Sequence, residues 1–433
     1  MKLFLAIFLI AVATLVGFQS AANWWMQSQT YILSSSAGIM SVRVQVLLTH
    51  RARHETITTG LPHYTEHLAW LNANDGVRDT DRHSNAWTNS YAVGYWLSGR
   101  PEDLPDLLSQ LKGIFDPLDL PESFALEERD IVLREYEFRI SDNPRAQASE
   151  AMDAFLYAGN SIAASVIGTP EDIMAFTYDD AKALHAETHI PENAVLVVTG
   201  DVSQRQLTRA MDEAGWPQAV PVADVLVPPP FDIAAPAVER FEFPGADAAP
   251  LLVWRKVVVL PEPVQFDLLE ARAALLADIL RANLPGGVAG PLRFDAAIAR
   301  SFDINIWPIG EDNIEIEFTA APDSGVTLTE LEEAFTATFA EIAASGVPED
   351  TYARILARFE DFWPDWGDED ETAEWMADYL LDRVSIMRPP LSERELKRIS
   401  DDLSLIATNT LLQQLVGDGR AAIAYVGPEE RFQ

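Results

Sequence analysis

The chain has 433 residues, a formal net charge of −36 at pH 7 and no cysteine. Its length suggests two to three domains, and its 48% hydrophobic and 23% charged content is that of a globular protein rather than a disordered or polytopic membrane chain. The negative charge argues against a nucleic-acid partner, because phosphates would be repelled, and the absence of cysteine means that metal ligands must come from His, Asp and Glu.

Residues 1–29 are predicted to be a signal peptide or a membrane anchor. Lys2 precedes a nearly unbroken apolar run over residues 3–18, and small residues surround a cleavage point near Ala22. The run is shorter than the roughly 20 residues of a full span, which favours a cleaved signal. Trp24 and Trp25 suit a membrane interface, so the anchor stays open as an alternative. In either case we expect export to the periplasm, and an anchor would tether the chain to the membrane.

A valine-rich alternating segment over 41–48 predicts a strand, and a helix is predicted over about 61–73. Pro62 suits the first turn of that helix, and no further Gly or Pro occurs before Gly76. The polar residues 74–84 then predict a loop.

Three side chains on this helix point to metal chemistry. His63 and His67 are four residues apart and share a helix face, so their imidazoles can bind one metal ion. Glu66 lies one step round, where it can face a water on the metal instead of the metal. The order His-x-x-Glu-His is the inverted zinc-protease motif, and zinc suits imidazole and carboxylate ligands. The alternative is two partly exposed histidines on an ordinary helix.

The next segments alternate between strand and helix. Residues 85–97 are aromatic and β-branched and predict a strand, and residues 121–139 predict a long helix. Glu128 and Glu135 are seven apart and therefore lie on one face of that helix, two turns from each other. A solvated charged face is the alternative for these glutamates. Further helices are predicted at 145–157, 170–189 and 203–214, with a buried strand at 193–202.

A proline-rich segment divides the chain. Six prolines lie between Pro217 and Pro236 without an amphipathic period, so residues 216–238 are predicted to be a linker. Residues 239–433 then repeat the element order of residues 30–215: strand, helix, strands, several helices and a last strand. We therefore predict an α+β fold of two similar domains, each a mostly antiparallel sheet packed with helices.

Several motifs, in order, resemble the pitrilysin/insulinase zinc peptidases, which include the mitochondrial processing peptidases and their bacterial relatives. Residues 60–67 are similar to the metal helix of this family, Asn85-Ala86-Trp87-Thr88 to its Asn-Ala-x-Thr edge strand, and residues 128–135 to its Glu-Arg-x-x-Val-x-x-Glu helix. Ile167-Gly168-Thr169 and Val198-Thr199-Gly200-Asp201 fit as well. The second half of the chain resembles the family only in the order and spacing of its predicted elements.

The resemblance implies roles for these residues. Glu135 would complete a Zn²⁺ site with His63 and His67, Glu128 would support a metal-bound histidine or the water from behind, and Glu66 would be the general base. The strand with Asn85, Ala86 and Thr88 would bind a peptide substrate as an extended neighbour.

The sequence departs from the family pattern in two places, and the second departure bears on the assembly. His67 and Glu135 are only 68 positions apart, because a helix and loop before Asn85 are trimmed. Phe302 stands where complete members carry a tyrosine that grips the substrate carbonyl, and the arginine spacing differs. We therefore predict a heterodimer with a related chain that supplies Arg and Tyr. The alternatives are a homodimer that is active by itself and a non-catalytic core subunit of a larger complex.

Overall fold

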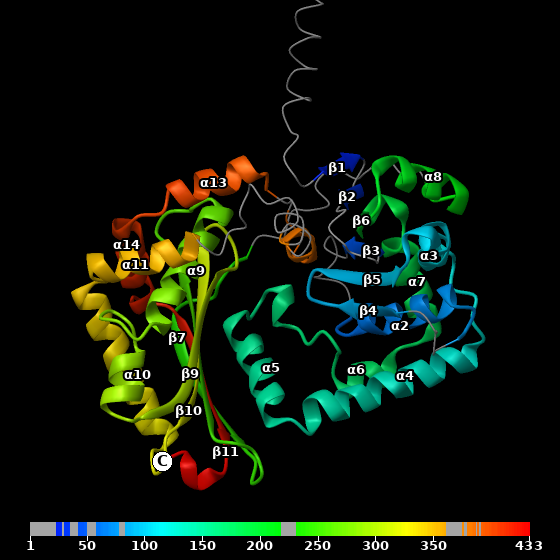
Figure 1. Ribbon diagram of the computed structural model, residues 1–433. Coiled ribbons are helices and arrows are strands. Elements are labelled where there is room, and N and C mark those ends of the chain that lie inside the picture. The colour runs from blue at the N-terminus through cyan, green and yellow to red at the C-terminus, as the bar shows by residue number, and fades with distance from the viewer. Residues whose placement is uncertain are drawn as a thin grey trace, which may run out of the picture. The chain divides into compact units, whose positions relative to one another are not determined.

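The computed structural model describes residues 23–27, 30–34, 42–49, 58–77, 83–217, 231–360, 375, 379–386, 388 and 391–433. These residues form helices and two separate β-sheets, which confirms the predicted α+β class (Figure 1). The chain divides into two compact units, each of which is discontinuous in sequence. The first comprises Met1–Asp130, Glu171–Pro228 and Trp363–Pro390, and the second comprises Ile131–Pro170, Pro229–Phe362 and Leu391–Gln433.

The first sheet has the strand order β1-β2-β6-β3-β5-β4. Its strands are β1 (Asn23–Gln27), β2 (Thr30–Ser34), β3 (Val42–Thr49), β4 (His83–Thr88), β5 (Ala92–Gly99) and β6 (Ala194–Gly200). Strand β2 runs parallel to β6, and all other neighbours are antiparallel. Strand β4 is therefore an edge strand, with one side of its backbone not paired within this sheet.

The second sheet repeats this topology. Its order is β7-β11-β8-β10-β9, with strands β7 (Ala237–Pro244), β8 (Leu251–Val259), β9 (Ala299–Pro308), β10 (Asn313–Pro322) and β11 (Arg420–Gly427). Strand β7 is parallel to β11 and the others are antiparallel, as in the series β2-β6-β3-β5-β4. Helix α2 (Leu61–Ala73) follows β3 and helix α9 (Phe266–Arg281) follows β8, and these two strands hold the same place in the two series. The predicted duplication is thus present in the strand order.

The first half contains six further helices among the described residues. They are α3 (Leu104–Lys112), α4 (Glu122–Tyr136), α5 (Pro144–Leu156), α6 (Pro170–Ala175), α7 (Tyr178–Thr188) and α8 (Gln204–Ala214). Helix α3 buries Leu104, Leu107, Leu108 and Leu111, the 3–4 spacing that places side chains on one face. It packs on β3 and β5, so one face of the first sheet is covered by this helix together with α2.

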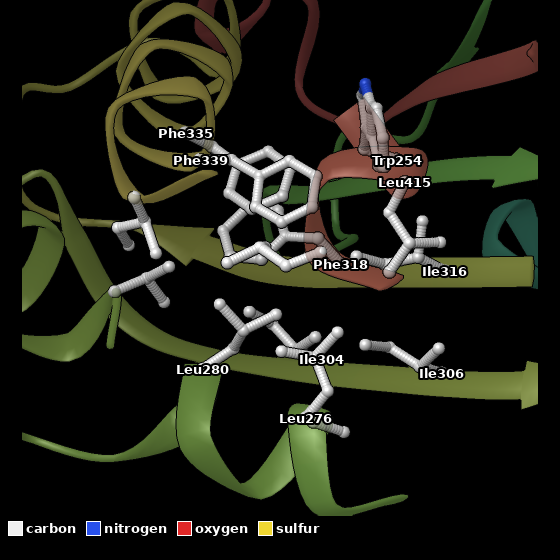
Figure 2. Packing of buried hydrophobic residues seen from close by; sticks show 14 of the residues in the cluster. Trp254, Leu276, Leu280, Ile304, Ile306, Ile316, Phe318, Phe335, Phe339 and Leu415 are labelled. Carbon is white, nitrogen blue, oxygen red and sulfur yellow. The ribbon is translucent and has the colours of Figure 1, made fainter. Parts of the chain in front are cut away.

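The second unit has its main core on one face of its sheet. Helices α9, α10 (Leu328–Ser345) and α14 (Leu405–Val416) contribute to this core, and α11 (Glu349–Glu360) and α13 (Glu393–Asp401) pack on α9. Figure 2 shows the aromatic centre, where Phe335 stacks on Phe318 with ring centroids 3.8 Å apart and Trp254 meets Phe335 edge-on.

The opposite face of the second sheet is covered by α5. Val253 and Val257 point to this face, since they alternate with the core residue Trp254 along β8. Arg255 shares the face and forms a buried ion pair with Glu315 on β10 at 2.5 Å and another with Asp153 of α5 at 2.7 Å. Helix α5 is therefore fixed to this sheet by both apolar and ionic contacts.

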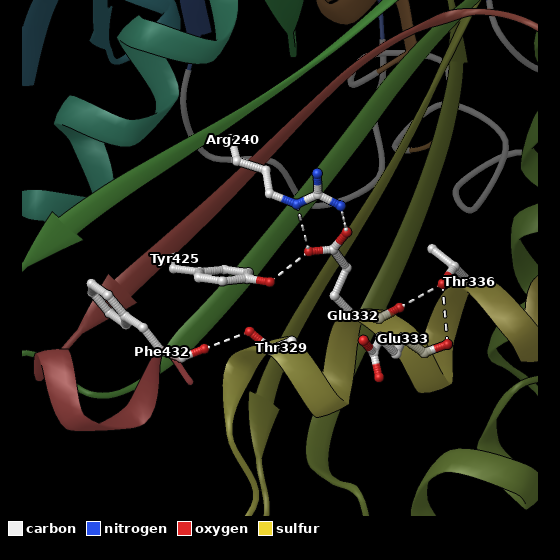
Figure 3. Close-up of polar contacts among 7 residues, drawn as sticks. All are labelled: Arg240, Thr329, Glu332, Glu333, Thr336, Tyr425 and Phe432. Atoms are coloured by element: carbon white, nitrogen blue, oxygen red, sulfur yellow. Dashed lines mark hydrogen bonds and ion pairs between the residues drawn. The ribbon is translucent and has the colours of Figure 1, made fainter.

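A second buried carboxylate links α10 to the sheet of the same unit. Glu332 accepts hydrogen bonds from the Arg240 guanidinium, with Nη2 at 2.6 Å, and from the Tyr425 hydroxyl at 2.6 Å (Figure 3). Burial, reinforced by the bond to Glu332, raises the pKa of Tyr425 to about 12. The hydroxyl therefore stays protonated and can donate this bond across the physiological range.

The compact units differ from the predicted continuous domains 30–215 and 239–433. Helix α5 belongs to the second unit, while Leu380 and Val384 pack with Leu47 and Val195 of the first. Residues 23–27, which fall within the predicted leader, form β1; residues 1–22 lie outside the described part. At the predicted linker, Trp216 is buried and meets Phe115, β7 begins at Ala237, and residues 218–230 lie outside the described part.

Two predicted elements are each split by a capping residue. The strand predicted at 85–97 is a hairpin of β4 and β5, because Asn89 Oδ1 accepts bonds from the backbone N–H groups of Tyr91 and Ala92 and closes a turn. The helix predicted at 170–189 is α6 followed by α7, whose N-terminus is capped by Thr177 through a capping box with Asp180. Among the described residues, no helix has the length and apolar character that a membrane crossing requires.

Candidate metal centre

Helix α2 begins where the sequence predicts. Gly60 precedes it with φ 80°, a left-handed conformation that favours glycine, and Pro62 lies in the first turn. His63 and Glu66 are both buried, and His67 is half-buried. The polar residues of the motif thus lie on an inward face of α2 and not on a solvated one, contrary to the alternative of an ordinary exposed helix.

Two hydrogen bonds join α2 to α4. The Tyr64 hydroxyl donates to the backbone carbonyl of Ala125 at 2.7 Å, and burial raises the pKa of Tyr64 to about 12, so the hydroxyl keeps its proton. One turn further along both helices, Nδ1 of His67 lies 3.1 Å from a Glu128 carboxylate oxygen. A carboxylate accepts, so Nδ1 carries the proton and Nε2 keeps the lone pair that a metal would use.

Glu135 meets the two histidines of α2. It lies two turns beyond Glu128 on the unbroken helix α4. One donor atom each from His63, His67 and Glu135 all lie within 4.8 Å of one another. Among the residues that the structure describes, this is the group of His, Asp and Glu side chains close enough to share a metal ion. Two imidazoles and one carboxylate are a donor set that suits zinc.

The candidate ligands have further contacts with one another and with a neighbouring side chain. The His63 and His67 rings meet edge-on, with centroids 4.8 Å apart at 82°. Oε1 of Glu135 lies 3.7 Å from Nη2 of the solvent-exposed Arg139. The candidate ligands therefore come from the inner face of α2 and from the last turns of α4.

Glu66 is held from the side of the sheet. The Thr88 hydroxyl, at the end of edge strand β4, donates to Oε2 of Glu66 at 2.7 Å. The sequence predicts Thr88 as a substrate-binding residue, and the structure brings its hydroxyl to the predicted general base. Asn85 is exposed on the same strand, and its Oδ1 accepts from the backbone N–H of Ala86 at 3.0 Å.

The edge strand itself is firmly seated. Trp87 packs over Gly94 of β5, where an added Cβ would come within 2.3 Å of the indole. Only glycine leaves room for this close approach. Trp87 also packs against the cluster that contains Leu47 and Leu380. The backbone of β4 beside Glu66 is thereby fixed.

One part of the site was missed at the sequence level. Tyr95 on β5 is fully buried, stacks against Trp70 of α2 and bonds through its hydroxyl to Nε2 of His189 at 2.8 Å. Burial raises the pKa of Tyr95 well above its ordinary value, and the charge of Glu66 raises it further. The pair is 94 residues apart in sequence, so no local motif signals it.

Comparisons with known proteins show what the chain resembles. No family model matches the chain. Its sequence is 27% identical over 184 residues to the zinc protease PqqE of Helicobacter pylori, covering 40% of this chain and 41% of that protein. It is 24% identical over 180 residues to the β subunit of the mitochondrial-processing peptidase of Neurospora crassa, covering 39% and 38%. It is also 23% identical over 188 residues to cytochrome b-c1 complex subunit 1 of Rattus norvegicus, covering 41% and 38%. The matches span about two fifths of these relatives' lengths.

Solved structures extend the likeness to nearly the whole chain. A putative M16-like peptidase from Alicyclobacillus acidocaldarius superposes with a TM-score of 0.73 at 14% identity, covering 96% of this chain and 100% of that one. The periplasmic protease PqqL from Escherichia coli superposes with a TM-score of 0.75 at 15% identity, and the match covers 95% of this chain and 48% of PqqL. A peptidase M16 inactive domain from Pseudomonas fluorescens superposes with a TM-score of 0.70 at 14% identity, and the match covers 94% of this chain and 98% of that domain. At these identities the structures show the fold.

The chain is a relative of the pitrilysin/insulinase-type peptidases. The predicted resemblance is thereby confirmed, for the fold over both units and for the sequence over about two fifths of the chain. The same comparisons also include an inactive M16 domain and a subunit of the cytochrome b-c1 complex. Similarity alone therefore does not establish activity, which depends on the residues of the site.

Proposed function

We propose that this chain is a zinc metallopeptidase subunit. The observation that carries the proposal is the convergence of donor atoms from His63, His67 and Glu135 within 4.8 Å, beside a buried Glu66. The hydrogen bond from His67 to Glu128 supports the same assignment, because metal-binding histidines commonly donate their second ring N–H to a carboxylate.

The chain's own residues would carry the proton transfers. Zinc bound to the three ligands would act as a Lewis acid beside a peptide carbonyl and promote ionisation of water. Glu66 is adjacent to His67 and would take a proton from the attacking water and pass it to the leaving amine. Glu128 would keep the His67 ring in one tautomer and one orientation while this happens.

The edge strand β4 supplies a place for the substrate. A peptide or an unfolded polypeptide can add to its unpaired side as a further strand, held by backbone hydrogen bonds that do not depend on sequence. Asn85 and Ala86 lie on this strand, next to Thr88 and its contact with Glu66. The net charge of −36 is compatible with basic peptides as substrates.

The second unit supports the proposal of a partner chain. Phe302 lies in β9, and its ring stacks on Phe318 at the edge of the main core, 6.1 Å between centroids. A phenyl ring cannot donate a hydrogen bond to a substrate carbonyl. We therefore propose a heterodimer with a related chain that supplies Arg and Tyr, with a homodimer as the alternative. The apolar run over residues 3–18 would direct the chain to the periplasm.

Peptide turnover tests the proposal. The zinc-loaded chain is assayed alone and mixed with a related two-domain chain that lacks the metal motif. We expect turnover in the mixture, and we expect Glu66→Gln to abolish it while the zinc content stays unchanged, because only the proton carrier is removed. Full turnover by the chain alone would contradict the heterodimer, and turnover that survives Glu66→Gln would contradict the assignment of the base.

The second candidate is a non-catalytic core subunit. The similarity to cytochrome b-c1 complex subunit 1 and the fold shared with an inactive M16 domain favour it. Zinc binding separates the two candidates, since a structural subunit has no need of a metal at His63 and His67. A chain that binds no zinc, with or without a partner, would favour the structural function.

A further inference from the structure

Thr88 and Glu66 form a contact that the peptidase assignment does not require. The hydroxyl of Thr88 is 2.7 Å from Oε2 of Glu66, which joins the last residue of β4 to the middle of α2. Glu66 is buried and Thr88 is half-buried, so this bond is partly shielded from bulk water. The inference drawn from it rests on the proposed function.

The position of Thr88 is fixed by the turn that follows it. Thr88 pairs with Val93 across the β4–β5 hairpin. Asn89 closes the turn with Oδ1 accepting from the N–H groups of Tyr91 and Ala92, both at 2.8 Å, and its Nδ2 donates to the carbonyl of Ser385 at 3.0 Å. The backbone at Thr88 is therefore held in place by the turn. The side chain of Thr88 also has a restricted χ1 because it is β-branched.

Tyr95 of β5 lies on the same face of the sheet as Thr88, because it pairs with Ala86, two residues before Thr88 on β4. Its hydroxyl group forms a hydrogen bond with His189. Thr188 donates its single hydroxyl proton to the carbonyl of Leu184, so it must accept from Nδ1 of His189, and Nε2 of that ring must accept from Tyr95. The Tyr95 proton thus points to His189, whereas the Thr88 hydroxyl donates to Glu66.

We infer that Thr88 is a positioning residue that orients the Glu66 carboxylate for proton transfer, and that it does not act by binding substrate. A charge-assisted bond from a fixed hydroxyl holds one carboxylate oxygen and therefore the plane of the group. A general base must be held within hydrogen-bond reach of the proton it removes, and the cost of misorientation appears in the chemical step.

Two substitutions at position 88 test this inference. Thr88→Val keeps the shape and the β-branch but removes the hydroxyl, and Thr88→Ser keeps the hydroxyl. We expect Thr88→Val to lower kcat by about 10- to 100-fold, a part of the usual general-base contribution, with KM within about twofold and zinc affinity unchanged. Thr88→Ser is expected to restore most of kcat. An unchanged kcat in Thr88→Val, or a loss confined to KM, would overturn the inference.

Crystal structures of the zinc-loaded wild type and of both variants provide a readout that does not depend on turnover. We expect the Glu66 carboxylate to rotate away from its wild-type position in Thr88→Val and to keep it in Thr88→Ser. A Glu66 that does not move in Thr88→Val would overturn the inference even if the wild type cleaves peptides. If instead the wild type cleaves no peptide and Glu66 still moves, the proposed function fails while the positioning contact stands.

Discussion

The Glu128 carboxylate lies 3.1 Å from Nδ1 of His67, which leaves Nε2 as the ring nitrogen that can bind a metal. Both residues are largely removed from solvent, with side-chain exposures of 6% and 15%, so the bond is only weakly screened. The contact connects the two helices that supply the candidate ligands. It therefore links the packing of α2 and α4 to the tautomer that a metal site needs.

Replacing Glu128 is expected to weaken zinc binding without removing a ligand. Glu128→Gln keeps the shape of the side chain but loses the charge that stabilises the Nδ1–H tautomer. Zinc affinity, measured by competition with a chelator, is expected to fall about 10- to 100-fold. The matched control is Glu127→Gln, an exposed neighbour on the same helix. An equal loss in both variants would mean that the general negative potential matters and not the bond to His67.

The aromatic stack of the second unit is expected to dominate its stability. Phe335 is fully buried and lies parallel to Phe318, at 3° between the ring planes. Phe335→Ala should lower the free energy of unfolding by about 3–5 kcal/mol through lost burial and a cavity. Phe294→Ala, where the side chain is 58% exposed, should change it by no more than about 0.5 kcal/mol. Urea unfolding of the two variants measures the difference, and similar losses would contradict the described core.

Acid should destabilise the first unit through His185. Burial lowers the pKa of His185 below its ordinary value, while its bond to the Ile114 carbonyl at 2.9 Å and the charge of Asp116 oppose the shift. The folded state therefore binds fewer protons than the unfolded state. This contribution to stability is fully present above pH ~6.5 and is lost as pH falls through the lowered pKa.

The matching variant is His185→Gln, whose amide can still donate to Ile114. Below pH ~6.5 the wild type should lose stability more steeply than this variant, by up to about 1.4 kcal/mol per pH unit. Urea unfolding on both sides of that pH gives the slopes. His83→Gln, on the exposed start of β4, is the control. If His185→Gln keeps the full wild-type slope, another group is responsible for the acid sensitivity.

The candidate ligands were predictable because their signals are local. Pro62 and the 3–4 spacing of His63, Glu66 and His67 fix the helix and its face, and the seven-residue interval from Glu128 to Glu135 fixes a face of α4. That α4 lies against α2 depends on long-range contacts such as Tyr64 with Ala125, and the resemblance to a family supplied this link.

Other features depend on partners that a linear pattern cannot identify. The period of α5 shows an apolar face, but nothing in the period says that it covers the second sheet through Arg255 and Asp153. The alternation of β4 tells which side Thr88 faces and not that its hydroxyl meets Glu66. The turn at Asn89 was hidden within a run of strand-forming residues, because its side-chain bonds override the propensity of its neighbours.

Anomalous diffraction at the zinc absorption edge tests the central claim most directly. In crystals of the zinc-loaded chain we expect a single strong anomalous peak within bonding distance of His63, His67 and Glu135. We expect Glu135→Ala to remove this peak or to weaken it greatly, because one of three protein ligands is lost. A peak elsewhere, or an unchanged peak and zinc content in Glu135→Ala, would contradict the assignment of the metal site.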